Sequence, residues 1–187
     1  MDNKIRNIIL AVVFCVIVLI VIIIISKSMK EVKPVNKYRY VRVWRKRNPL
    51  VSHLENNDGD YKSHYINLAE IEVISGKTNV ALNKTVIASS EYSPLLNFTN
   101  GNMTDMAHTK DDDIEWLLVD LGDLFHIDKV RLHNRQDCCQ QRAQDLIIQL
   151  SANENMSDMI ESNLITKEQA PKMTFTWVPS NKTITAE

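Results

Sequence analysis

The chain contains one long apolar stretch, followed by a region in which short apolar segments alternate with polar ones. From Ile8 to Ile25 there is no charge, no Pro and no Gly. Beyond it, short runs with apolar residues at alternate positions are separated by clusters of Asn, Asp and Gly, a pattern typical of β-strands and turns. The candidate strands are Arg39–Arg45, Tyr65–Ile74, Thr85–Ser89, Trp116–Leu121, Lys129–Asn134, Leu146–Ser151 and Thr174–Val178. Their number and spacing predict an all-β, antiparallel β-sandwich.

The apolar stretch predicts a single transmembrane α-helix. Its eighteen residues span about 27 Å at ~1.5 Å per residue, close to the ~30 Å hydrocarbon core of a bilayer. A cleavable signal peptide is disfavoured, because the eighteen-residue apolar run is longer than the ~7–15 residues usual for such peptides. Cys15 is then a small membrane-embedded side chain. The predicted organisation is an N-terminal flank (1–7), a transmembrane helix (8–26), a basic linker (27–37) and a β-sandwich (38–187).

The formal net charge of −1 conceals a strongly basic segment after the apolar stretch. Residues 27–47 carry nine Lys and Arg against one acidic residue, and residues 48–187 carry eleven against twenty-one. Such a segment beside a bilayer attracts anionic head groups, so we expect a lipid partner. The positive-inside rule places the following domain on the cytoplasmic side. Five Asn-x-Ser/Thr sequons, at Asn83, Asn97, Asn102, Asn155 and Asn181, favour the lumenal side. The sequence leaves the sidedness of this single-pass protein open.

Three basic residues in a fixed spacing are the strongest candidates for a binding site. His108 stands in TDMAHTK, and Arg135 and Arg142 flank a Cys pair in HNRQDCCQQR. Guanidinium and imidazole groups present directed N–H donors, which suit the oxygens of a sugar. Asp137 lies between the arginines and is expected to orient a guanidinium. The alternative is a surface cluster of ion pairs.

This spacing resembles the sugar-binding signature of the F-type lectins, or fucolectins, within the discoidin and coagulation factor type C group. The resemblance implies a galactose-binding-like jelly-roll sandwich. It also implies that His108, Arg135 and Arg142 take the axial 4-hydroxyl, the 3-hydroxyl and the ring oxygen of L-fucose. In that family the adjacent cysteines, here Cys138 and Cys139, form a disulfide whose sulfurs pack on the sugar ring.

The Cys138–Cys139 pair has a second interpretation. Neighbouring Cα atoms lie ~3.8 Å apart, below the usual ~4.4–6.8 Å of disulfides, so a bond between neighbours requires an unusual backbone. Two free thiols are the alternative, and they are expected if the domain faces a reducing compartment.

The order of the strands departs from that of the family. Segments similar to the family's closing strands, RYVRVW at 39–44 and LAEIEV at 68–73, come first here, and a segment similar to its opening, Asn79–Lys84, follows. A circular permutation would let residues 38–74 complete the sandwich, because the termini of such domains often lie close together. The alternative is the remnant of an earlier repeat before a truncated domain.

The resemblance also implies a structural calcium ion. The corresponding ligands are Ala69, Glu70, Asn97, Asn100, Asn102 and Asp105. Calcium prefers six to eight oxygens, which carboxylates, amides and carbonyls can supply. Asn100 replaces an Asp of the family motif, so the site loses a charge. The alternation of apolar and polar residues shifts by one position at Ala69-Glu70, which predicts a β-bulge there. The alternative is a polar turn beside an unrelated strand glutamate.

These features predict a non-enzymatic binding protein, because the chain has no nucleophile elbow, no phosphate-binding Gly loop and no HExxH. Asp111–Asp113 is interpreted as a solvated loop, and no nucleic-acid partner is expected. The first hypothesis is a membrane-anchored lectin that binds fucosylated glycans in recognition or attachment. The second is a minor capsid protein at the internal membrane of a virion, which uses the sandwich to bind neighbouring capsid or membrane proteins. It follows from a resemblance of strings such as YVRVWR and YINLAEIEV to proteins of large double-stranded DNA viruses. The oligomeric state is left open.

Overall fold

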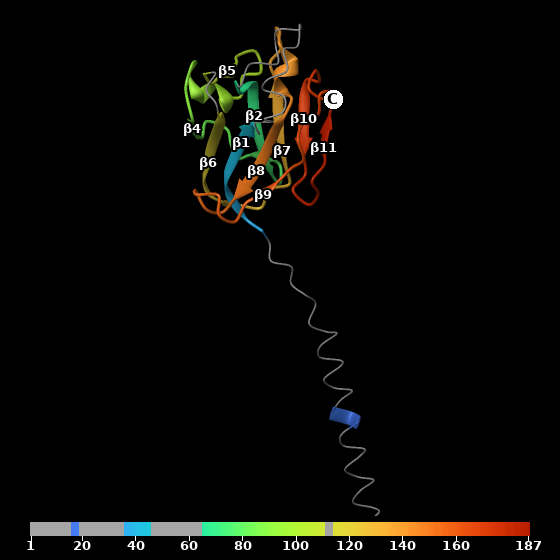
Figure 1. The fold of residues 1–187 in the computed structure, drawn as a ribbon. Coiled ribbons are helices and arrows are strands. Elements are labelled where there is room, and N and C mark those ends of the chain that lie inside the picture. The colour runs from blue at the N-terminus through green and yellow to red at the C-terminus, as the bar shows by residue number, and fades with distance from the viewer. Residues whose placement is uncertain (1–15, 19–35, 46–64, 111–113) are drawn as a thin grey trace, which may run out of the picture. The chain divides into compact units, whose positions relative to one another are not determined.

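The described part of the chain folds into two antiparallel β-sheets that pack face to face (Figure 1). The structure is a computed structural model and describes residues 16–18, 36–45, 65–110 and 114–187. Most of the predicted transmembrane helix (8–26), most of the basic linker (27–37) and Asp111–Asp113 therefore lie outside the described residues. Within the described ranges, no helix has the length and hydropathy needed to cross a membrane.

One sheet has five strands and the other has six. The five-stranded sheet has the order β4 (Thr85–Ala88), β6 (Trp116–Phe125), β1 (Tyr38–Arg45), β8 (Leu146–Ser151) and β9 (Ile160–Glu161). The six-stranded sheet has the order β11 (Ile184–Ala186), β10 (Thr174–Trp177), β7 (Lys129–Asn134), β2 (Asn67–Ser75) and β3 (Thr78–Asn79), and β5 (Ala107–His108) also pairs with β2. Two short 3-10 helices, η1 (Leu95–Phe98) and η2 (Gln140–Ala143), lie in the loops.

All seven strands predicted from the apolar alternation are present. The bounds of β7 and β8 are those predicted, and β6 continues beyond its predicted end to Phe125. The sequence pattern missed β3, β5, β9 and β11, each of two or three residues. A strand of two or three residues is too short to show a repeating pattern of apolar and polar positions, so the pattern cannot predict it.

The core forms between the two sheets from the inward residues of both. The five-stranded sheet contributes residues such as Val41, Leu117 and Ile148, and the six-stranded sheet contributes residues such as Leu132 and Trp177. Each of these five side chains is fully buried. One continuous apolar layer therefore holds both sheets and fixes the loops at their ends.

The two N-terminal strands occupy interior positions of the sheets. In the five-stranded sheet β1 pairs with β6 on one side and with β8 on the other. In the six-stranded sheet β2 lies between β7 and β3. Residues 38–45 and 67–75 thus complete both layers. The circular permutation relative to the lectin family stays a prediction.

The predicted bulge lies in β2. The pairing of β2 with β7 shifts between Leu68 and Glu70, so Ala69 is the extra residue. The shift in the alternation of apolar residues therefore correctly predicted this bulge. Because of the bulge, the buried Glu70 side chain lies beside the loop that follows η1. There it accepts a hydrogen bond from the Gly101 amide.

Candidate functional site: a basic pocket beside an adjacent-cysteine disulfide

His108 is held in a buried position by β5 and by two aromatic rings. It pairs with Asn67 of β2, and only 8% of its surface is exposed. Its Nδ1 lies against the carbonyl oxygen of Thr109. A carbonyl only accepts, so Nδ1 carries the proton, and a neutral ring then presents Nε2 as an acceptor. The ring centroid lies 4.5 Å from that of Tyr65 and 5.2 Å from that of Tyr92.

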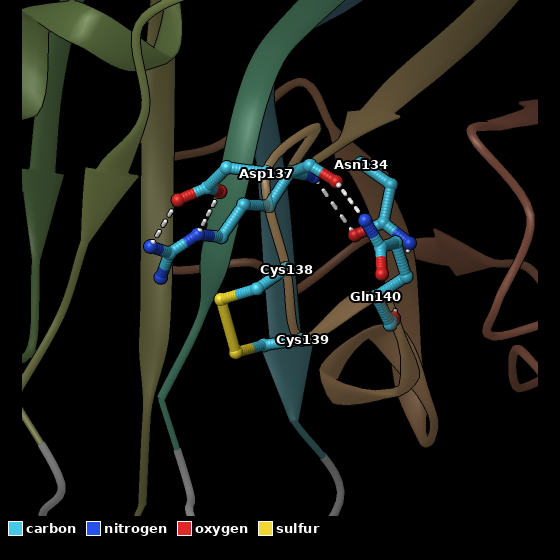
Figure 2. The surroundings of a disulfide bond; sticks show 6 residues. Asn134, Asp137, Cys138, Cys139 and Gln140 are labelled. Atoms are coloured by element: carbon cyan, nitrogen blue, oxygen red, sulfur yellow. Dashed lines mark hydrogen bonds and ion pairs between the residues drawn. A yellow bond between two sulfur atoms is a disulfide. The ribbon is translucent and has the colours of Figure 1, made fainter.

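The loop after β7 positions Arg135, and a buried amide anchors this loop. The Asn134 Nδ2 lies 3.0 Å from the carbonyl oxygen of Gln140, 2.9 Å from that of Ala170 and 2.8 Å from that of Lys172. The Asn134 Oδ1 accepts a hydrogen bond of 2.9 Å from the Arg135 amide. Figure 2 shows how Asn134 and Gln140 flank the turn. Asn134 therefore ties both ends of the loop to the body of the sandwich.

Arg135 and Asp137 form a bidentate ion pair. The sequence predicted that Asp137 orients a guanidinium group. The Arg135 Nε donates to one oxygen of Asp137, and Nη2 donates to the other at 2.7 Å. The hydrogen bonds from Arg135 lower the pKa of Asp137 to about 2, and they raise the pKa of Arg135. The pair is therefore charged at neutral pH, and the guanidinium plane is restrained.

Cys138 and Cys139 are joined by a disulfide between neighbouring residues (Figure 2). Their Cα atoms lie 3.8 Å apart, and the described residues contain no cis peptide bond. The backbone accommodates the small ring through Cys139, whose φ of 65° is left-handed. Cys139 is also the N-cap of η2, so the disulfide defines where η2 begins.

Arg142 extends from η2 towards an aromatic residue. Its guanidinium carbon lies 5.0 Å from the centre of the Tyr65 ring, within the ~6 Å range of a cation–π contact. Its backbone amide donates to the Cys139 carbonyl at 3.0 Å. The start of β2 and the loop after β7 therefore meet at this contact.

The three basic residues of the predicted signature line one pocket. The cavity has a volume of about 510 Å³ and is lined by Tyr65, Tyr92, Met106, His108, Lys110, Arg135 and Arg142. Asp137 lines an adjoining pocket that also includes Asp105, Met106 and Arg135. Cys138 and Cys139 are not among the described residues that line either cavity. The arrangement offers directed donors beside aromatic faces, which suits a small polyhydroxylated ligand.

Glu70 stands at the centre of the predicted calcium site. Its side chain is fully buried, and its Oε2 accepts a 3.1 Å hydrogen bond from the Gly101 amide. Within the described ranges its Oε1 is buried and has no hydrogen-bond partner. Burial raises the pKa of this carboxyl to about 7, although the Gly101 amide opposes the rise. A buried carboxylate oxygen without a partner is a group that a cation would satisfy.

The side chains after η1 gather in the same loop. The Asn100 Nδ2 lies 3.4 Å from both Asn97 Oδ1 and Asp105 Oδ2, and the Asn100 Oδ1 accepts from the Asn102 amide at 2.8 Å. Ala69 lies in the bulge directly before Glu70. In the described part of the chain, no three His, Cys, Asp or Glu residues gather. This donor set depends on amide oxygens, and with Glu70 and Asp105 it fits a hard cation such as calcium.

Several residues of the pocket carried no signal in the sequence. Tyr65 and Tyr92 stand next to histidine and glutamate in polar surroundings, and Lys110 precedes an acidic run. A tyrosine in a polar segment is unremarkable along one chain. The pairing of β5 with β2 brings Tyr65 to His108, and a 3.0 Å hydrogen bond from the Tyr92 amide to the His108 carbonyl brings Tyr92 there.

Comparison with known families found one similarity, which covers the second half of the chain. The F5/F8 type C family model described as a NedA-like, galactose-binding domain matches residues 97–183. Residues 97–183 are therefore similar to a discoidin-type, galactose-binding domain, in agreement with the all-β sandwich, and the matched segment includes His108, Arg135 and Arg142. Comparisons with curated proteins and with solved structures gave no match.

Proposed function

We propose that this protein is a non-enzymatic lectin that binds a fucose-type sugar in the basic pocket. The observation that carries the proposal is the convergence of His108, Arg135 and Arg142 on one cavity from β5, the loop after β7 and η2. Two guanidinium groups and an imidazole match the hydroxyl and ring oxygens of a sugar, and Tyr65 and Tyr92 offer apolar surface. The match to a galactose-binding domain supports carbohydrate as the ligand class.

The test is a glycan array followed by calorimetry on the full chain in detergent, oxidised and with calcium present. We expect fucosylated glycans to bind with a Kd in the millimolar to micromolar range, about −4 to −8 kcal/mol. His108→Ala and Arg135→Ala should each cost at least ~1.5 kcal/mol, the scale of a hydrogen bond to a charged group. Arg42→Ala is the matched control, because Arg42 bonds to Gln149 on the outer side of the five-stranded sheet.

An absence of fucose binding by the oxidised, calcium-loaded protein would overturn the lectin proposal. The scaffold hypothesis, in which the sandwich binds capsid or membrane proteins, would then be the better account, and a protein partner would be sought by crosslinking. Binding of galactosylated but not fucosylated glycans would keep the carbohydrate ligand and overturn only the fucose specificity.

The calcium ion is part of the same proposal. Glu70, Asn97, Asn100, Asn102, Asp105 and the Ala69 carbonyl are its proposed ligands. When bound, the ion would neutralise the buried Glu70 carboxylate and fasten the loop after η1 to β2. That loop leads directly into His108, so the ion would support the position of the imidazole.

Membrane anchoring rests on the apolar stretch at 8–25 and on the basic residues that follow it. Extraction of membranes at alkaline pH should leave the full chain in the pellet, and removal of residues 8–26 should release it. Release of the full chain by this treatment would contradict the anchor.

A further inference from the structure

Arg45 is the last residue of β1, and it lies behind the basic pocket. In the five-stranded sheet Arg45 pairs with Leu146 of β8, and its amide donates to the Glu115 carbonyl at 3.1 Å. Both neighbours of β1 thus hold the backbone of Arg45. Its side chain extends from the strand end to carbonyls of the neighbouring loops.

The Arg45 guanidinium contacts backbone carbonyls of two separate segments. Nη2 donates to the carbonyl oxygen of Tyr65 at 2.7 Å and to that of Arg142, and Nη1 donates to that of Gln144. Tyr65 leads into β2, whereas Arg142 and Gln144 belong to η2 and its C-cap. Tyr65 and Arg142 both line the pocket.

The same two residues also meet through their side chains, because the Arg142 guanidinium lies 5.0 Å over the Tyr65 ring. Arg45 therefore joins the backbones of two residues whose side chains form one wall of the cavity. A planar guanidinium presents several donors in fixed directions, which suits carbonyls that converge from different segments. The ammonium group of a lysine lacks this planar arrangement of donors.

We propose that Arg45 is a positioning residue of the sugar site, and that its guanidinium sets the placement of Tyr65 and Arg142 without touching the ligand. This inference rests on the proposed function for its effect on affinity. Its structural part, the fastening of η2 to the start of β2, is measurable without a ligand.

The first experiment is hydrogen exchange of the full chain, with Arg45→Gln, Arg45→Lys and the control Arg42→Gln. Arg42 lies on the same strand, but its Nε donates to the Gln149 side chain. We expect the amides of Arg142 and Gln144 to exchange about tenfold faster in Arg45→Gln, because local opening becomes easier. The amides of β8 should be unchanged. In Arg45→Lys, the exchange rates of these two amides should lie between those of wild type and Arg45→Gln. This variant still tests the proposal if Arg45→Gln does not fold.

The second experiment is a double-mutant cycle on sugar affinity. Arg45→Gln should weaken binding about tenfold in the wild-type background and only about twofold when Arg142 is already Ala, because interacting residues are not additive. Arg42→Gln should leave the affinity unchanged. A merely structural role would lower the melting temperature and give equal losses in both backgrounds.

The outcomes separate the two proposals. If the wild type binds no glycan, the lectin proposal fails, and hydrogen exchange alone decides whether Arg45 fastens η2. If the wild type binds but Arg45→Gln changes neither the affinity nor the exchange of Arg142 and Gln144, the role of Arg45 is overturned while the lectin proposal stands.

Discussion

Cys139 combines a left-handed backbone with a covalent bond to the residue before it. A residue other than Gly at positive φ is unfavourable by about 1–3 kcal/mol unless its surroundings impose the conformation. The bond to Cys138 is such a constraint, and η2 with Arg142 begins at Cys139. Oxidation state and the placement of Arg142 are therefore connected.

Replacing both cysteines by Ser should weaken sugar binding, because Cys139 is then no longer held at positive φ and η2 loses its defined start. The variant with Ser at 138 and Gly at 139 is the matched control, since Gly adopts positive φ at no steric cost. We expect the Gly variant to recover part of the affinity that the double Ser variant loses, as measured by calorimetry. Equal losses in the two variants would show that the sulfurs act by direct contact with the ligand.

At this scale the sequence predicted which residue types serve the site but not the residues that support them. The spacing of His108, Arg135 and Arg142 was readable because each type has a distinct chemistry. Arg45 was predicted only as the end of a strand within a basic segment, and Asn134 only as the end of a strand. Their roles depend on which carbonyls surround them, and a sequence does not contain that information.

At the scale of elements, β1 and β6 are joined by an ion pair on the outer face of the five-stranded sheet. The Arg39 Nε and Nη2 donate to the two carboxylate oxygens of Asp120 at 2.7 and 2.8 Å. The side chains are 40% and 34% exposed, so solvent screens the pair, and its contribution to stability is small.

The hydrogen bond from Arg39 lowers the pKa of Asp120 below its ordinary value. Since the folded state holds this proton less tightly than the unfolded state, the pair stabilises the fold above the unfolded pKa of ~3.9, and this stability is lost as the pH falls through the lower folded pKa. Asp120→Asn should reduce the free energy of unfolding at neutral pH, and the difference from wild type should vanish as the pH falls below the lowered folded pKa of Asp120. Urea denaturation across pH measures this. In an Arg39→Gln background the effect of Asp120→Asn should disappear, and a persistent effect would exclude the pair as its cause.

The bulge of β2 and the loop after η1 form the second connection between elements. A calcium ion that binds only the folded protein adds about 2.7 kcal/mol at a hundredfold excess over Kd, which raises the melting temperature by several degrees. Glu70→Gln should abolish most of this rise. At pH 8 it should leave the metal-free protein equally or slightly more stable, because burial disfavours the charged carboxylate and raises its pKa to about 7.

Calorimetric scans with calcium and with chelator test this connection, with Asp123→Asn, an exposed residue near the end of β6, as the control. Identical melting temperatures of the wild type in both conditions would show that Asn100, in place of the family's Asp, has removed the site. His108 would then depend on β2 and the aromatic rings alone.

At the scale of the whole molecule, alternation of apolar residues was enough to predict two layers of strands. It worked best where a strand has one buried and one half-buried face, as in β7, where the two kinds of residue alternate, whereas all six residues of β8 are buried. It could not supply the sheet order, since the pairing of β1 with β6 and β8 joins segments far apart in sequence. The short strands, including the one that carries His108, depend on that order.

Deletion of residues 38–75 should remove one interior strand from each sheet and expose the apolar layer between them. We expect the remaining 76–187 fragment to be insoluble or to melt without cooperativity, because its core residues lose their partners. Expression, size-exclusion chromatography and calorimetry of the fragment measure this. A soluble fragment with a cooperative transition would contradict the prediction and favour the remnant over the permutation.

The interior placement of β1 and β2 also determines the order in which the domain can assemble during synthesis. The ribosome releases these two strands first, but Trp44 pairs with Trp116 and Ile147, and Ile71 pairs with Leu132. Pairings between segments so distant in sequence slow folding, because long loops must close before the contacts form. The five-stranded sheet therefore cannot close until β9 has left the ribosome, and the six-stranded sheet cannot close until β11 has left it. Until β6 and β7 are made, the apolar strands β1 and β2 lack these partners, and a chaperone that shields extended apolar segments should raise the yield of folded protein.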